Sequence, residues 1–238
     1  MKITYIYHSG FSVELEHAIL LFDYYKGEIP VFSLDKPIFV FVSHKHPDHF
    51  NKRIFDLAKN YKEITFILSN DTKMNEAYMN RINLPEIARE KLLYIGKNTT
   101  LTLPAISVET LTSTDQGVAF IITYEDKTIY HAGDLNWWTW RGETEKEYHD
   151  MTGRFMTEMD KLEGRNIDVA FMTLDPRQED RFWWGFDHFM KTTKTKIVFP
   201  MHFEKDYSII SRLKLQKESE EYKDRVMDIN EQGQEFII

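Results

Sequence analysis

The sequence predicts a single α/β domain, residues 1–238, with two β-sheets and helices on the outside. Short apolar runs separated by turn residues fill most of the first 130 positions, and the remaining positions mix strand-like and helical patterns. Hydrophobic residues make up 42% of the chain and aromatic residues 14%, which is enough for a sizeable core. No linker rich in Gly, Ser or Pro interrupts the pattern. We therefore expect one continuous domain.

The first half of the chain contains most of the predicted strands. Apolar runs, several of them alternating, predict strands at 3–7, 11–15, 18–22, 38–42, 64–68, 101–103, 106–111, 118–124 and 127–130. Turn residues such as Pro104 and the segment 115–117 separate the later strands. Helices are predicted at 51–59 and at 71–81, where Asn70 or Asp71 is a suitable cap. This half is therefore expected to be mainly β.

The second half alternates helices and strands. Met151, Phe155, Met159 and Leu162 follow one another at helical spacing and predict a helix at 145–162. Further helices are predicted at 182–192 and 208–225. Strands are predicted at 169–174 and 197–199, with the segment 200–202 ending the second one, and 235–238 is expected at a sheet edge.

Composition narrows the class of function. The chain has no Cys, which excludes a disulfide scaffold and a thiolate zinc site and fits a reducing cytosol. Its start lacks the apolar segment of a secretion signal, and no run approaches the roughly 18 apolar residues of a membrane span. The net charge of -8 is spread along the chain and gives no basic face for nucleic acid. We expect a cytoplasmic protein that acts on a small molecule, away from membranes and nucleic acids; the sequence does not indicate an oligomeric state.

One stretch, residues 43–49, carries most of the chemistry. His44, His46, Asp48 and His49 lie within six residues, directly after the apolar run 38–42. Imidazole and carboxylate are ligands that first-row metals prefer, and loops at the carboxyl ends of strands are where α/β proteins place ligands. We predict a metal site for two ions, with His44 and His46 on one ion and Asp48 and His49 on the other.

Two later strand ends also carry ligand-type residues. His131-Ala132-Gly133-Asp134 follows an apolar run, and Gly133 would let Asp134 approach and bridge two cations. His202 follows the apolar residues 197–200. Alone, a turn Asp or a packed core His would explain each residue. Three strand ends that supply His or Asp in the order cluster, Asp134, His202 favour a shared metal site.

With these motifs the sequence resembles the metallo-β-lactamase superfamily, whose signature is His-x-His-x-Asp-His followed by further His, Asp and His ligands. Within it the chain looks most like the branch of ascorbate-6-phosphate lactonase-like hydrolases. The similar segments are Ile19-Leu20-Leu21-Phe22-Asp23, residues 131–134 and Phe199-Pro200-Met201-His202. The resemblance implies a four-layer αββα sandwich with the site at one edge. It also implies that Asp23 supports the ligand loop through hydrogen bonds.

The sequence departs from the family pattern at one ligand. The family places another His upstream of the bridging Asp, whereas residues 110–117 contain none. Asp115, or more weakly Ser113 or Thr114, could replace it as an oxygen ligand. Such a replacement would favour manganese over zinc. Alternatively, the first metal is weak or absent, and a second metal on Asp48, His49, Asp134 and His202 does the work.

The predicted function is a metal-dependent hydrolase of a small anionic ester, lactone or phosphoester. One or two divalent ions, Zn or Mn with Fe as a further candidate, would activate a water, and Asp48 would orient that water. The competing interpretation is a degenerate binding or sensing protein of the same fold with one or no catalytic metal. It rests on the missing His.

Overall fold

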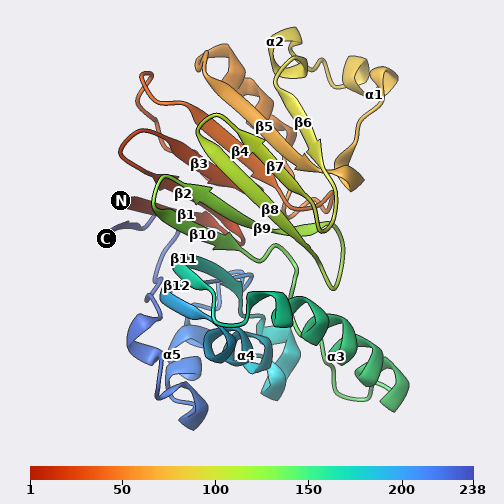
Figure 1. Ribbon diagram of the computed structural model, residues 1–238, viewed down its shortest axis with the longest axis vertical. Helices are drawn as coiled ribbons and strands as arrows, with labels where there is room; N and C mark the ends of the chain where they lie inside the picture. The colour runs from red at the N-terminus through yellow and green to blue at the C-terminus, as the bar shows by residue number, and fades with distance from the viewer. The chain divides into compact units, whose positions relative to one another are not determined.

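The computed structural model describes residues 1–238, and the chain divides into two compact units (Figure 1). The first unit comprises Met1–Gly96 and Glu231–Ile238, and the second comprises Lys97–Asn230. Each unit contains one β-sheet with helices. The predicted α/β class with two sheets and helices is therefore confirmed.

The sheet of the first unit has seven strands. Their order is β13 (Glu235–Ile237), β1 (Lys2–Tyr7), β2 (Gly10–Glu14), β3 (Ile19–Phe22), β4 (Ile38–Val42), β5 (Ile64–Ser69) and β6 (Leu92–Ile95). The pairs from β13 to β3 are antiparallel, and the pairs from β3 to β6 are parallel. As a result β1, β3 and β4 run in the same direction, and their carboxyl ends reach one edge of the sheet.

Short helices complete the first unit. They are η1 (Lys52–Lys59), η2 (Asn70–Thr72), α1 (Glu76–Arg81) and α2 (Glu86–Arg89). The predicted helix 51–59 forms as a 3₁₀-helix capped by Asn51, whose side chain accepts a hydrogen bond from the amide of Arg53. The predicted helix 71–81 is interrupted, because Asn75 caps a new helix. Its side-chain oxygen accepts a hydrogen bond from the amide of Tyr78. Phe55 and Phe66 pack against each other in the core with tilted rings, whose centroids are 5.1 Å apart.

The sheet of the second unit has six strands. Their order is β12 (Lys194–Met201), β11 (Asn166–Thr173), β10 (Lys127–His131), β9 (Val118–Tyr124), β8 (Ile106–Thr112) and β7 (Thr100–Leu103). The strands β10, β11 and β12 are parallel neighbours, and the other pairs are antiparallel. The carboxyl ends of β10, β11 and β12 therefore also meet at one edge.

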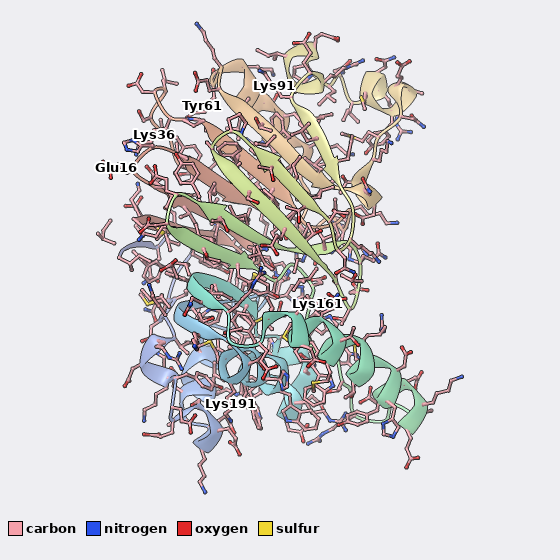
Figure 2. All side chains as sticks on the ribbon, in the orientation of Figure 1. Glu16, Lys36, Tyr61, Lys91, Lys161 and Lys191 are labelled. Atoms are coloured by element: carbon pink, nitrogen blue, oxygen red, sulfur yellow. The ribbon has the colours of Figure 1, made fainter.

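The helices of the second unit are α3 (Glu145–Met159), η3 (Asp160–Leu162), η4 (Pro176–Arg181), α4 (Trp184–Thr192), α5 (Ser208–Lys214), η5 (Lys217–Ser219) and η6 (Lys223–Arg225). Thr144 and Glu147 form a capping box at the start of α3. Figure 2 shows Lys161 just beyond α3 and Lys191 on α4. No helix of the structure combines the length and the apolar composition that a membrane crossing requires.

Two predicted boundaries are wrong. The strand predicted to end before Pro200 continues to Met201, because β12 lies at the edge of its sheet, where a missing amide is tolerated. The helix predicted at 208–225 ends at Lys214. Beyond it the chain returns to β12, where Val226 bridges Val198 and the amide of Met227 donates to the Val198 carbonyl. That return needs extended backbone, which a continuous helix cannot supply.

Candidate metal centre

The edge of the first unit gathers residues that directly follow β1, β3 and β4. His8 follows β1, Asp23 follows β3, and Ser43 begins the 43–49 loop after β4. His8 has a φ of 57° and Asp23 a φ of 38°, the left-handed region that residues other than Gly rarely adopt. Such backbone costs about 1–3 kcal/mol per residue and is typical of functional sites. Both residues turn the chain abruptly at the edge where the ligand loop begins.

Asp23 holds the ligand loop in place. One carboxylate oxygen accepts the amide of Ser43 at 2.7 Å. The other accepts hydrogen bonds from the Ser43 hydroxyl and from Nδ1 of His49, the latter at 2.8 Å. A neutral imidazole that donates through Nδ1 carries its lone pair on Nε2, the form that binds a metal. Asp23 thereby holds both the loop and the ring of His49 in place.

The three histidines of the loop lie against one another. The ring centroid of His44 is 4.6 Å from that of His46 and 4.2 Å from that of His49. His44 and His49 are fully buried, and His46 is partly exposed. The carbonyl of His46 accepts the amides of His49 and Phe50, both at 3.0 Å, which closes the loop. These hydrogen bonds make the 46–50 segment a tight turn.

His8 joins the loop residues Asp48 and His49. The ligand atoms of the three lie within 4.8 Å of one another, and Nε2 of His8 is 3.5 Å from Oδ2 of Asp48. The hydrogen bond with His8, helped by the nearby His49, holds the pKa of Asp48 well below its usual range despite partial burial. Two imidazoles and an ionised carboxylate at this spacing fit the donor set of a divalent transition metal.

In the second unit, Asp134 and His202 lie next to each other. Oδ1 of Asp134 is 3.4 Å from Nε2 of His202, and each residue is only 4% exposed. Gly133, with a φ of 51°, turns the chain after β10, and His202 itself has a φ of 70°. The indole of Trp138 donates to the carbonyl of Asp134 at 2.9 Å. This pair supplies a second imidazole and carboxylate combination.

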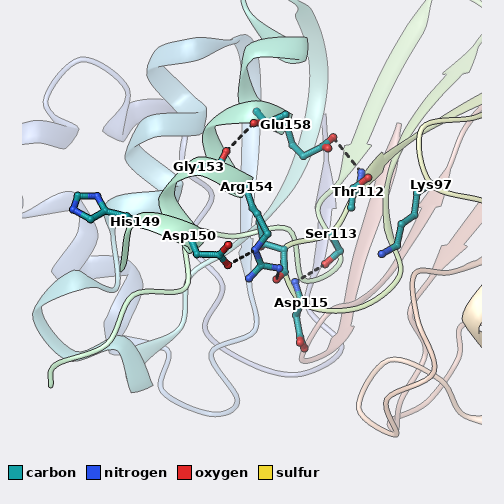
Figure 3. A pocket seen from close by; sticks show the side chains of 11 residues that line it. Lys97, Thr112, Ser113, Asp115, His149, Asp150, Gly153, Arg154 and Glu158 are labelled. Atoms are coloured by element: carbon teal, nitrogen blue, oxygen red, sulfur yellow. Dashed lines mark hydrogen bonds and ion pairs between the residues drawn. The ribbon is translucent and has the colours of Figure 1, made fainter. Parts of the chain in front are cut away.

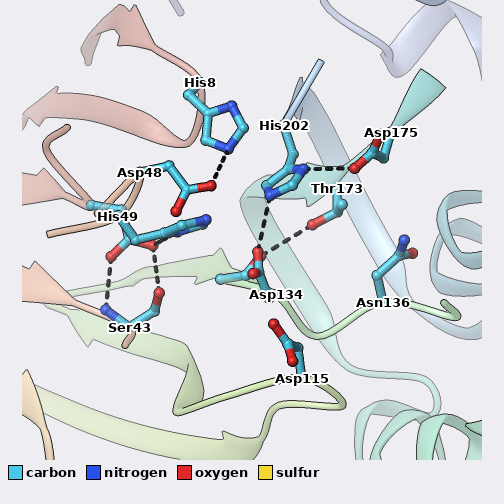
Figure 4. A network of polar contacts seen from close by, with 12 residues as sticks. His8, Ser43, Asp48, His49, Asp115, Asp134, Asn136, Thr173, Asp175 and His202 are labelled. Carbon is cyan, nitrogen blue, oxygen red and sulfur yellow. Dashed lines mark hydrogen bonds and ion pairs between the residues drawn. The ribbon is translucent and has the colours of Figure 1, made fainter. Parts of the chain in front are cut away.

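Asp175, which follows β11, supports His202 as Asp23 supports His49. Its Oδ2 lies 2.9 Å from Nδ1 of His202 (Figure 4). Arg177 pairs with the same carboxylate. Burial acts to raise the pKa of Asp175, but the hydrogen bonds from His202 and Arg177 lower it to about 2. Asp175 is not among the residues that the sequence predicted for the site. The available signal was an Asp just beyond an apolar strand, the pattern already recognised at Asp23.

The segment predicted to replace the missing His lies in the turn between β8 and β9. Asp115 is exposed and lines a crevice of about 550 Å³ together with Lys97 and Arg154 (Figure 3). Ser113 and Thr114 are buried. The Thr114 hydroxyl lies 2.6 Å from the Asn136 carbonyl and 3.3 Å from that of Asp134. The carboxylate of Asp115 does not belong to the sets of His and Asp side chains whose ligand atoms lie within 4.8 Å of one another. Its role as a replacement ligand therefore stays a prediction.

The chain is an α/β protein with two sheets, and each sheet carries His and Asp side chains of metal-ligand type at one edge. The family model described as the beta-lactamase superfamily domain matches residues 2–149. This match covers more than half of the chain. The protein belongs to this superfamily, in agreement with the resemblance noted in the sequence.

Individual relatives agree with this assignment. A UPF0173 metal-dependent hydrolase of Nanoarchaeum equitans is 28% identical over 214 residues, which cover 85% of this chain and 84% of the relative. Igni18, a novel metallo hydrolase from Ignicoccus hospitalis, has 18% identity and a TM-score of 0.62 over 100% of this chain and 98% of its own. The metallo-beta-lactamase fold protein YhfI from Bacillus subtilis has 15% identity and a TM-score of 0.63 over 99% and 98%. The predicted metallo-β-lactamase type of fold is confirmed.

Proposed function

We propose that the protein is a metal-dependent hydrolase of a small anionic ester, lactone or phosphoester. The observation that carries the proposal is the pair of histidines backed by buried carboxylates, His49 by Asp23 and His202 by Asp175. This arrangement orients an imidazole for a metal, and purely structural histidines do not require it twice. The relatives named metal-dependent hydrolases support the same activity.

We propose that the protein binds one or two divalent ions through its His and Asp side chains. Zn or Mn suits the mixture of imidazole and carboxylate donors, and Fe is a further candidate. His8 is the stronger candidate for the additional ligand, because its ring already lies with Asp48 and His49, whereas Asp115 is the alternative. The proposed ligands are His8, His44, His46, Asp48, His49, Asp134 and His202.

The bound metal would supply an acidified water and a positive charge for the developing oxyanion. Asp48, whose pKa lies below its usual range, is ionised at neutral pH, and its carboxylate can accept a hydrogen bond from the attacking water and orient it. Asp23 and Asp175 keep the histidines in one tautomer. The lack of Cys supports a cytoplasmic location, and the acidic composition supports a small-molecule substrate over nucleic acid.

The proposal is tested by metal content and hydrolysis together. Untagged protein is analysed by plasma mass spectrometry beside a His46→Ala, Asp134→Asn double variant, with exposed His17→Ala as the matched control. We expect bound metal in the wild type and control and little in the double variant. Lactones, phosphodiesters and thioesters are then screened with Mn, Zn or Fe, and hydrolysis should disappear in Asp48→Ala. Equal, negligible metal in all samples would contradict the proposal, and metal without hydrolysis would favour the binding or sensing alternative.

A further inference from the structure

A second feature of the first unit is a crevice directly beside the ligand loop. It has a volume of about 430 Å³. Lys45, Pro47 and Phe50 form one wall, and Lys45 and Pro47 are themselves part of the 43–49 loop. The other lining residues come from η1 and from the segment after β5: Lys52, Asp71, Thr72, Lys73, Met74, Asn75 and Tyr78.

The charge of this crevice is positive in an acidic protein. Three lysines, Lys45, Lys52 and Lys73, face a single carboxylate, Asp71, whereas the whole chain has a net charge of -8. None of these lysines forms an ion pair in the structure. Lys52 instead lies over the ring of Tyr78, with Nζ 4.7 Å from the centroid. Three ammonium groups without carboxylate partners produce a local field that attracts anions.

The single carboxylate has a structural role in the crevice. Oδ2 of Asp71 accepts the backbone amide of Lys45 at 3.1 Å. This hydrogen bond ties the segment after β5 to the ligand loop. Asp71 therefore joins the two walls, and it neutralises only part of the lysine charge.

Three other crevices of the structure differ from it in charge. The crevice near Asp115 has two basic side chains, Lys97 and Arg154, but three carboxylates. The crevice near Trp183 has two arginines and two carboxylates, and the crevice near Tyr24 has one arginine and two carboxylates. Among these four crevices, the one that borders the ligand loop has an excess of positive charge and the other three do not.

We propose that this crevice binds the phosphate group of a phosphorylated substrate. A phosphate monoester carries a charge between -1.5 and -2 and three terminal oxygens, so it matches three lysines better than a monovalent carboxylate does. The apolar side chains of Pro47, Phe50 and Met74 provide a surface for the organic part of the same molecule. The inference extends the proposed hydrolase function, since the bound phosphate would hold the substrate beside the loop that contains His44 and His46.

The test measures binding in the absence of metal, so it does not depend on the hydrolase proposal. Phenyl phosphate is titrated by calorimetry into chelator-treated protein at low salt, with benzoate as the carboxylate probe. The crevice variant combines the three substitutions Lys45→Gln, Lys52→Gln and Lys73→Gln. The control is the triple variant Lys62→Gln, Lys146→Gln, Lys194→Gln. It removes the same charge from surface lysines that lie outside the crevice and form no ion pair.

We expect the dissociation constant of phenyl phosphate to rise about tenfold or more in the crevice variant, which corresponds to about 1.4 kcal/mol, and to change little in the control. Benzoate should bind the wild type more weakly. A Lys45→Gln, Lys73→Gln double variant, which keeps Lys52 on Tyr78, should show part of the effect and guards against misfolding. Equal losses in both triple variants, or equal affinity for benzoate and phenyl phosphate, would overturn the proposal.

Discussion

Two buried aspartates illustrate how single residues orient histidine side chains in this protein. Asp23 is fully excluded from solvent and accepts hydrogen bonds from Ser43 and His49. Asp175 is equally buried and contacts His202 and Arg177. A buried carboxylate without such partners would be costly, and both carboxylates use them to orient an imidazole. The two residues thus perform the same task in different sheets.

We predict that Asp175→Asn weakens metal binding by about 10-fold to 100-fold, because an amide supports the imidazole of His202 less well than a carboxylate does. Competition with a chromophoric chelator measures the affinity. Asp168→Asn on the same strand, where the wild-type residue pairs with Lys196 at the surface, serves as the control. Unchanged affinity in Asp175→Asn would show that this contact does not tune the metal.

At the scale of elements, parallel strands explain why the ligands converge. Residues after β1, β3 and β4 reach one edge of the first sheet, and residues after β10, β11 and β12 reach one edge of the second. The outer helices then pack on these sheets through aromatic contacts. Phe189 on α4 stacks on Tyr130 of β10, with centroids 4.8 Å apart. His188 of α4 lies between Trp137 and Phe155 of α3, at 6.2 and 5.6 Å.

The packing of His188 predicts a dependence of stability on pH. Burial lowers the pKa of His188, although the carboxylates of Asp187 and Asp160 oppose the effect. The unfolded chain then binds a proton more readily, so stability falls as the pH decreases below about 6.5. Urea unfolding at about pH 7.5 and about pH 5.5 should show a smaller loss for His188→Gln than for the wild type.

The matched control for this prediction is His149→Gln, which changes an exposed histidine next to Tyr148. It should lose as much stability as the wild type does between the two pH values. If His188→Gln and the wild type respond identically, burial of His188 does not contribute to the pH dependence.

At the scale of the whole molecule, the chain leaves the first unit after Gly96 and returns to it at Glu231. The first connection, between β6 and β7, is only the four residues 96–99, and no long flexible linker separates the units. The last strand, β13, pairs with β1, so both ends of the chain lie in one sheet. The single domain expected from the sequence stays a prediction, which cooperative unfolding would test.

We predict that the two units unfold in one cooperative transition. All five tryptophans lie between residues 137 and 184, so their fluorescence reports on the second unit, whereas far-ultraviolet circular dichroism reports on both. Urea curves from the two signals should coincide in midpoint and slope. A fluorescence midpoint clearly separate from the dichroism midpoint would mean that the units unfold independently.

The sequence alone determined the local features of this protein. Apolar periodicity located most strands, and the loop 43–49 displayed its ligand-type residues as four nearly adjacent side chains. The same apolar pattern predicted that Asp134 and His202 directly follow strands. These signals are local, because a strand and the loop that follows it are encoded by neighbouring residues.

The tertiary structure decided which strand ends become neighbours. His8 joins Asp48 and His49 because β1 runs parallel to β3 and β4, and Asp175 meets His202 because β11 pairs with β12. Strand pairing also decided that β12 continues through Pro200 and that the chain after Lys214 leaves its helix to reach Val198. Such contacts depend on sheet order and register, which residues distant in the sequence set together.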